Sequence, residues 1–422
     1  MSVVAFLCDS QAAAFAPEGP VWLKARRAAA MKAFERTGIP NRRVEAWKYT
    51  DLQQALGEGL VPASPYAGRV EGYKPFAKRA GSRIVFANGF VQGTEAGEGI
   101  EIVDVTASEF APEWVRKEFG TQAVGADQPL GAAALALMQT GVAIRVKGKD
   151  RALHLDFQNL ASGQGWAAHS RVLLIVDAGA SLRLFESHTG DAGKSFLNLG
   201  FEFVLADGAQ VEHIRLHKGA EEGIEVASLG GTIAQNARYR ALYVSLGGKL
   251  SRVDANMRLT GDGASAIVNN VAVAHEGIHD TTTVMDHAHP RTQSRQLFKS
   301  VVGADGRSVS QGRVTVREGA VKSDSHQLFK ALLLSPRAEA DAKPELEILA
   351  DDVTCGHGTA IGSLDADAMF YLRARGIPEH EARDLLVRAF LDEALEPFGD
   401  EELRADLRNE IDKGLSLVGD AA

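Results

Sequence analysis

The chain of 422 residues is 45% hydrophobic and 24% charged, which is typical of a globular protein with a large core and two or three domains. Its formal net charge is −9 and it has no basic run, which argues against general nucleic-acid binding and against docking on anionic membranes. The two cysteines, Cys8 and Cys355, lie far apart, so the sequence has neither a disulfide framework nor a CxxC metal motif.

The sequence has no sign of export or of membrane insertion. No basic residue precedes the short apolar patch at the N-terminus, which makes it a poor signal peptide. No apolar run approaches the roughly 18 residues of a membrane span. Isolated cysteines suit a reducing compartment, so we expect a cytoplasmic protein.

Residues 1–141 are predicted to form a helical region with a small strand pair. Apolar residues recur at helical spacing after Pro20, and Gly38 ends this helix. The Asn88-Gly89 dipeptide marks a turn within the strand pair. The expected helices cover residues 20–37, 51–56, about 107–119 and about 129–139, and the strand pair covers residues 83–105.

Residues 142–362 carry short alternating segments that each end at Gly, Asp or Asn. Three turns, which begin at Asp177, Asp207 and Asp262, share a Gly-Ala pair. Many short strands without intervening helices exclude a doubly wound α/β fold and leave a sandwich, a barrel or a β-solenoid. The repeated strand–turn–strand texture favours the solenoid.

Residues 363–422 are predicted to be helical. Asp365 can cap the first helix, and Gly376 ends it. The second helix carries an apolar stripe that suits a protein partner. Alternatively, this stripe packs on the open edge of the β-core, and both roles are compatible. The predicted partner-binding residues are Leu385, Leu386, Phe390 and Leu391.

The segment from His275 to His279 matches the zinc-protease motif HExxH letter for letter. Zinc binding by this motif needs both imidazoles one turn apart on a continuous helix. Its flanks are rich in β-branched residues, and Gly277 lies inside it, so a helix is not expected here. A zinc protease would bind stoichiometric zinc and lose activity when Glu276 is changed.

Two other apparent signatures are weak. The sequence Gly193-Lys194-Ser195 looks like the end of a phosphate-binding loop, but His188 stands where the first glycine should be. A group of histidines could bind metal if stacked strands brought them together, although surface or ladder roles are more common. This group comprises His275, His279, His287, His289 and His326.

The sequence LEILADDVTCGHGTAIG, which ends at residue 362, is the most informative stretch. On an extended strand, Cys355 and His357 face the same side, and the glycines beside them leave room for close approach. A thiolate beside an imidazole suits iron, zinc or an iron–sulfur cluster. Two ligands cannot complete a tetrahedral site. If these residues bind metal, the other ligands must come from a partner chain; otherwise they are a buried cysteine and a hydrogen-bonded histidine.

Residues 287–327 and 331–377 closely resemble the C-terminal half of the SufD branch of the SufB/SufD family. The segment RVEAWKYT at residues 43–50 resembles the same family near its N-terminus. This chain departs from the family pattern in two places. Leu328, Phe329 and Lys330 stand where polar residues are usual, and Gly356 stands where Ser is usual.

The resemblance implies a right-handed parallel β-helix between helical ends. It implies a scaffold subunit without a chemical step of its own, which pairs with a SufB-like subunit and binds a SufC-like ATPase through its C-terminal helices. A transient iron–sulfur cluster would form at the SufB-like interface, with His357 as the main ligand and Cys355 as its supporting thiol. The isolated chain could also form a homodimer, with or without metal.

A competing hypothesis is a β-helix enzyme that acts on polysaccharide. Such enzymes usually have a groove lined with Asp, Arg and aromatic platforms, together with a secretion signal. Aromatic residues make up only 7% of this chain, and no signal peptide is evident, so the scaffold is favoured.

Overall fold

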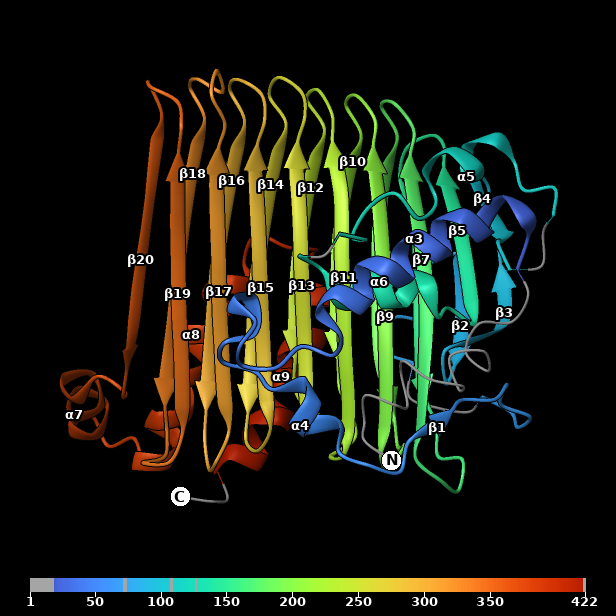
Figure 1. Ribbon diagram of the computed structural model, residues 1–422. Helices are drawn as coiled ribbons and strands as arrows, with labels where there is room; N and C mark the ends of the chain where they lie inside the picture. The colour runs from blue at the N-terminus through green and yellow to red at the C-terminus, as the bar shows by residue number, and fades with distance from the viewer. Residues whose placement is uncertain (1–18, 71–73, 107–108, 126, 420–422) are drawn as a thin grey trace.

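A computed structural model describes residues 19–70, 74–106, 109–125 and 127–419, so Cys8 lies outside the described residues. Two ten-stranded sheets face each other and form a parallel β-solenoid, with helices at both ends of the chain (Figure 1). The expected mainly-β solenoid is therefore confirmed. Among the helices of the described part, none is long and apolar enough to cross a membrane.

The strands alternate between the two sheets along the chain. The first, here called the odd sheet, contains β1 (Val61–Pro62), β4 (Ile100–Asp104), β5 (Thr140–Val146), β7 (Trp166–Val176), β9 (Ser195–Leu205), β11 (Gly223–Ile233), β13 (Leu250–Leu259), β15 (Ile278–His287), β17 (Arg307–Val316) and β19 (Glu339–Ile348). From β5 to β19 its neighbouring strands are parallel, and each coil of the solenoid adds one strand.

The second sheet, here called the even sheet, contains β2 (Ser82–Ala87), β3 (Phe90–Glu95), β6 (Arg151–Asn159), β8 (Ser181–Gly190), β10 (Gln210–His217), β12 (Arg238–Ser245), β14 (Ser265–Ala274), β16 (Gln293–Val302), β18 (Asp324–Leu333) and β20 (Thr354–Gly362). The predicted turn at Asn88-Gly89 joins β2 and β3 as an antiparallel hairpin. The remaining strand of the expected pair, β4, lies in the odd sheet antiparallel to β5, so residues 83–105 contribute to both sheets.

The corner between an odd strand and the next even strand is built in the same way in successive coils. One residue there has a left-handed backbone, which glycine adopts without steric cost. At one such corner, the N–H of Gly179 donates to the carbonyl oxygen of Asp207 in the next coil over 2.9 Å. At the five corners between β7 and β16, these left-handed residues recur every 27 to 29 positions and are Gly179, Gly208, Asn236, Gly263 and Arg291.

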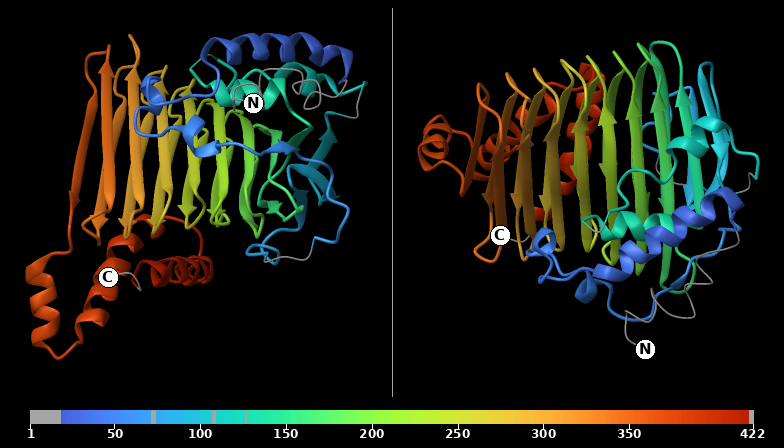
Figure 2. Two further views of the ribbon diagram at one scale, coloured as in Figure 1. Left: turned by 60° about the horizontal axis from the view of Figure 1, so that its bottom comes forward. Right: turned by 45° about the horizontal axis from the view of Figure 1, so that its top comes forward.

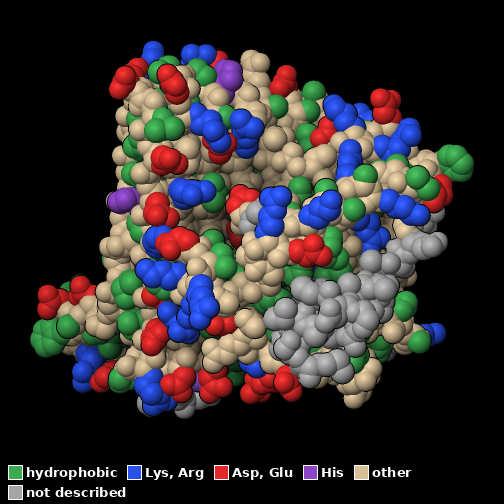
Figure 3. Space-filling model, viewed as in Figure 1, with side chains coloured by type: hydrophobic (Ala, Val, Ile, Leu, Met, Phe, Trp, Pro, Cys, Tyr) green, Lys and Arg blue, Asp and Glu red, His purple; other side chains and the backbone are tan. Residues whose placement is uncertain are grey.

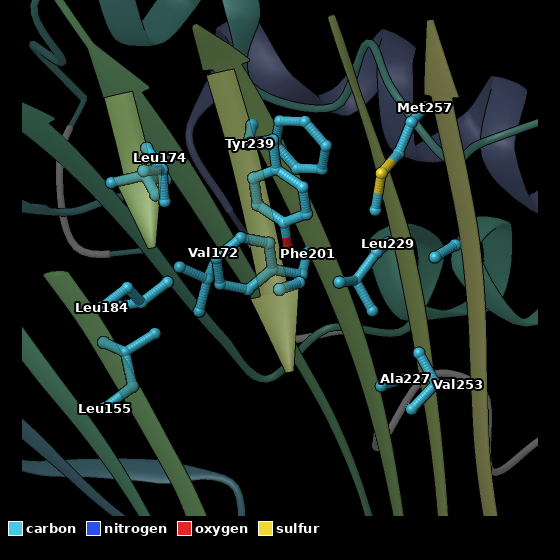
Figure 4. Packing of buried hydrophobic residues seen from close by; sticks show 14 of the residues in the cluster. Leu155, Val172, Leu174, Leu184, Phe201, Ala227, Leu229, Tyr239, Val253 and Met257 are labelled. Atoms are coloured by element: carbon cyan, nitrogen blue, oxygen red, sulfur yellow. The ribbon is translucent and has the colours of Figure 1, made fainter. Parts of the chain in front are cut away.

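The space between the sheets is the main hydrophobic core. Alternate side chains of each strand point inward, and Leu184, Phe201 and Tyr239 are among those that fill the interior (Figure 4). These three side chains are almost fully buried. Burying a large apolar side chain contributes roughly 1.5–3 kcal/mol, so this continuous interior accounts for much of the stability of the solenoid.

The N-terminal helices pack against the outer face of the odd sheet, as Figure 1 shows for α3 and α6. Arg171 and Glu202 fix this layer from within the sheet: both are fully buried, and Arg171 Nε lies 2.5 Å from Glu202 Oε1. Glu202 also accepts the backbone N–H groups of residues 120–122. The helices of this region are α3 (Val21–Thr37), the 3-10 turn η1 (Glu45–Trp47), α4 (Leu52–Leu56), α5 (Glu113–Glu118) and α6 (Pro129–Ala136).

The C-terminal helices are α7 (Ala366–Ala374), α8 (Glu379–Leu395) and α9 (Glu401–Gly419). As predicted, Asp365 caps α7, where its side chain accepts the N–H of Ala368 over 2.7 Å. Helices α8 and α9 pack against the outer face of the even sheet. Helix α7 projects away from both sheets, and none of its residues is buried (Figures 1 and 2).

Candidate functional site at the open end of the solenoid

The last strands of the two sheets, β19 and β20, have a strand neighbour on one side only. Figure 1 shows both at one extremity of the solenoid, with no further strand beyond them. Edge strands offer unpaired backbone N–H and C=O groups to another chain. Apolar side chains are also exposed at this end, with Ile348 at 42% and Ile361 at 44% exposure. This end can therefore accept another polypeptide.

Cys355 and His357 lie on β20. Their partners in the parallel register with β18 are Ser325 and Gln327, which are buried, so both side chains lie on the inward row of the sheet. Cys355 is half-buried and packs against the edge of the core, whereas His357 is exposed because no further coil covers it. The structure thus confirms that the two residues share one face of a strand.

Gly356 and Gly358 flank His357 along the strand and lie on the outward row of β20. An ideal Cβ at Gly356 would lie 3.3 Å from Nδ1 of His326, and one at Gly358 would lie 3.3 Å from Cδ1 of Leu328. Both distances are shorter than usual Cβ contacts. The glycines therefore leave room for the side chains of His326 and Leu328, while the parallel register with β18 sets the positions of Cys355 and His357.

The interior behind these ligands is polar. Ser294 and Ser325 are buried, and their hydroxyl oxygens lie 2.7 Å apart. Ser294 Oγ is also 2.8 Å from Nε2 of buried His287. This row of polar groups leads along the interior to Cys355, the next residue in register. Burial raises the pKa of the Cys355 thiol, and a hydrogen bond from the backbone of Ser325 lowers it in part.

The site supplies two donors, one sulfur and one nitrogen. Among the described residues there is no group of three or more His, Cys, Asp or Glu side chains that could hold a metal ion. A soft thiolate and an imidazole fit iron or an iron–sulfur cluster, but a complete coordination sphere needs about four ligands. Cys355 and His357 alone do not complete such a coordination sphere, and His357 is exposed at the end where a second chain can dock.

The structure does not form the zinc-protease motif. His275 lies in the turn between β14 and β15, and His279 is buried at the start of β15, so the two are not on a helix. The Nδ1 atom of His279 lies 2.6 Å from Ser245 Oγ, and burial lowers the pKa of this imidazole to about 4. His279 is therefore a neutral core residue.

The other histidines of the candidate group are also dispersed. His287 is buried, whereas exposed His326 points outward, with its Nε2 atom 3.2 Å from Asp324 Oδ1. The apparent phosphate loop at residues 193–195 leads directly into strand β9 and not into a helix, so it lacks the helix N-terminus that holds a phosphate.

The predicted stripe on α8 divides between two environments. Leu391 is 1% exposed and packs on the even sheet, and half-buried Phe390 has its ring centroid 4.2 Å from Lys299 Nζ. Leu386 is half-buried, and Leu385 is 48% exposed. One side of α8 therefore anchors the helix, while Leu385 remains available at the surface.

Sequence reasoning missed the aromatic residues of α7. Phe370 is 75% exposed and Tyr371 is 56% exposed. A helix with two exposed aromatic side chains and no buried residue is unusual in a protein that acts alone, because aromatic residues dominate interface energetics. The sequence pattern predicted a capped helix that contains these apolar residues. It did not show that this helix projects from the solenoid.

Two family models match the chain: the "SUF system FeS cluster assembly, SufBD core domain" at residues 159–390 and the "SufBD protein N-terminal region" at residues 7–61. The iron-sulfur cluster assembly protein SufD of Escherichia coli is 29% identical over 399 residues, which cover 92% of this chain and 91% of that protein. A SufBD family protein of Synechocystis is 28% identical over 88% of this chain and 86% of its own length. The chloroplastic protein ABCI7 of Arabidopsis thaliana is 34% identical over 59% of this chain and 53% of its own length.

Proposed function

Since this chain belongs to the SufBD family of the SUF iron–sulfur cluster assembly system, we propose that it is a non-catalytic scaffold subunit that pairs with a SufB-like subunit. The observation that carries this proposal is the half-built site. Cys355 and His357 lie on one face of an edge strand with one free side, where His357 is exposed, Cys355 is half-buried and the described residues supply no further ligands.

In this proposal, the partner completes both the sheet edge and the site. A strand of the SufB-like subunit can bond to the free edges of β19 and β20, and its own ligands then meet His357. The nascent cluster is cargo that both subunits hold. His357 binds iron through a ring nitrogen, and half-buried Cys355 binds it as a thiolate or supports the histidine.

The SufC-like ATPase is proposed to dock on α7 and on the adjacent exposed part of α8. Phe370, Tyr371 and Leu385 supply the apolar contact there. Helix α7 follows β20 directly in the chain, so movement of this helix can reach the strand that carries the ligands. ATP hydrolysis by that partner would in this way alter the interface between the two scaffold subunits.

Co-expression with the SufB-like and SufC-like proteins of the same source tests the proposal. We expect one stable complex that contains all three chains after size-exclusion chromatography. Without the SufB-like chain, we expect two copies of this chain to pair through the free edges of β19 and β20. Light scattering would then show a homodimer. A chain that stays separate from both partners would refute the scaffold function.

A further inference from the structure

The interior row that ends at His357 contains two glutamines. Gln296 on β16, Gln327 on β18 and His357 on β20 are successive partners in the parallel register. Both glutamines are 2% exposed, whereas His357 lies at the open end. Neighbouring strands lie about 4.8 Å apart, so a carboxamide on one strand can reach the side chain on the next.

Gly312 on the opposite sheet provides the room for these two carboxamides. An ideal Cβ at this position would lie 2.5 Å from Gln327 Nε2 and 3.2 Å from Gln296 Oε1. Gly312 does not have a left-handed backbone, so space and not conformation requires glycine here. The amide nitrogen of Gln327 and the amide oxygen of Gln296 therefore both lie close to Gly312 in the interior.

The hydrogen bonds of the row are incomplete at both glutamines, since Gln296 Nε2 also lacks a partner among the described residues. Thr283 Oγ1 donates to Gln296 Oε1 over 2.5 Å, which orients the first carboxamide. Neither Oε1 nor Nε2 of Gln327 has a hydrogen-bond partner among the described residues. Leaving a buried polar group unpaired is destabilising, so a carboxamide held in this position needs a function or a partner. His357, the next residue in the row, does not bond to this carboxamide in the isolated chain, so the contact inferred below would form when a partner covers the open end.

We propose that Gln327 is a positioning residue for His357: its side-chain oxygen accepts the N–H of one ring nitrogen, so that the other nitrogen faces the iron of the nascent cluster. This inference deepens the proposed function and rests on it. Histidine ligands commonly donate their second ring N–H to such an acceptor, which fixes the tautomer and the ring orientation. An exposed imidazole at the end of the solenoid has particular need of this support.

The test uses the complex of all three chains, reconstituted anaerobically with ferrous iron and sulfide. Gln327→Met keeps the size of the side chain but removes the acceptor, and Gln327→Asn keeps the amide but shortens its reach. Gln293→Met is the matched control, because Gln293 is an exposed glutamine on the neighbouring strand β16. Retained iron and sulfide are measured together with the nitrogen hyperfine coupling of the reduced cluster in pulsed EPR.

We expect both Gln327 variants to retain about tenfold less cluster. The histidine nitrogen coupling should weaken or split into several components, a change that a purely structural role would not produce. The control should match the unmodified complex. If Gln327→Met prevents assembly of the complex, Gln327→Asn still tests whether the side chain positions His357.

Unchanged cluster content and coupling in the Gln327 variants, with both lost in His357→Ala, would overturn this inference alone. If His357→Ala also left both readouts unchanged, the proposed site itself would fail.

Discussion

The guanidinium carbon of Arg252 lies 3.9 Å from the ring centroid of Trp47, and both side chains are buried. Trp47 belongs to the segment at residues 43–50, and Arg252 lies on β13 of the odd sheet. Arg252 also donates to the carbonyl oxygen of Ala46 over 2.8 Å and forms an ion pair with Asp280. The stacking of a cation on an aromatic face therefore ties the N-terminal segment to the solenoid.

Replacing Trp47 should destabilise the protein. Trp47→Ala removes a large buried ring and the stacking surface of Arg252, so we expect the free energy of unfolding to fall by about 3–5 kcal/mol. Denaturant titration followed by circular dichroism measures this change. Arg42→Ala, at an exposed position directly before this segment, should stay within about 0.5 kcal/mol of the unmodified protein. Equal stability of the two variants would contradict the account.

Acid should destabilise the fold through its buried histidines. Burial lowers the pKa of His279 to about 4, and that of His169 to about 3. An unfolded histidine titrates near 6.5, so between that pH and the folded pKa the unfolded chain binds protons that the native chain does not. This stability is complete above about pH 6.5 and is lost as the pH falls toward 4.

The contribution of His279 can be isolated. Between pH 7 and pH 5, this histidine alone should lower the free energy of unfolding by about 2 kcal/mol. His279→Asn should reduce the difference between the two pH values by that amount, whatever it does to stability at pH 7. Denaturant titrations of both proteins at both pH values give the comparison. The same pH difference in both would show that His279 is not a neutral core residue.

Helix α7 should carry part of the contact with the ATPase partner. Phe370→Glu places a charge in an apolar contact, so we expect the affinity for the SufC-like protein to fall about tenfold or more. Because Phe370 is 75% exposed, the variant should fold normally. Leu417→Glu, at an exposed apolar position on α9, is the control and should bind normally. Isothermal titration would decide this, and equal affinity of both variants would place the contact elsewhere.

The solenoid was predictable because its corners have a simple chemistry. The turns that begin at Asp177, Asp207 and Asp262 contain the glycines that the corner needs. The repeat of about 28 residues was not evident, because Asn236 and Arg291 occupy the same left-handed position in other coils. A single sequence cannot show that these residues are equivalent to glycine, since only the stacking of coils imposes that conformation on them.

The pair Cys355 and His357 could be predicted because their spacing of two residues is local to one strand. The position of Gln327 beside His357 could not, because the two are 30 residues apart and become neighbours only through the register of β18 and β20. One departure from the family pattern has a clear structural role: Phe329 is buried, and its ring stacks on that of Phe298 with centroids 4.6 Å apart.

The surface of the odd sheet does not suggest a competing site. Basic and acidic side chains are interspersed over this face, without a single-sign field that would attract a polyanion (Figure 3). Among the described residues, His357 on β20 and the two aromatic residues of α7 are exposed. Both lie near the same end of the molecule, as expected if two partners meet there (Figures 1 and 2).

The most direct test of the central claim is the iron and acid-labile sulfide content of the anaerobically purified complex of all three chains, with and without His357→Ala. His326→Ala is the matched control, because His326 lies one strand away but on the outward row of the sheet. We predict that His357→Ala loses most of the cluster while the complex stays assembled, and that His326→Ala retains it. Equal cluster content in all three preparations would contradict the assignment of the half-site to β20.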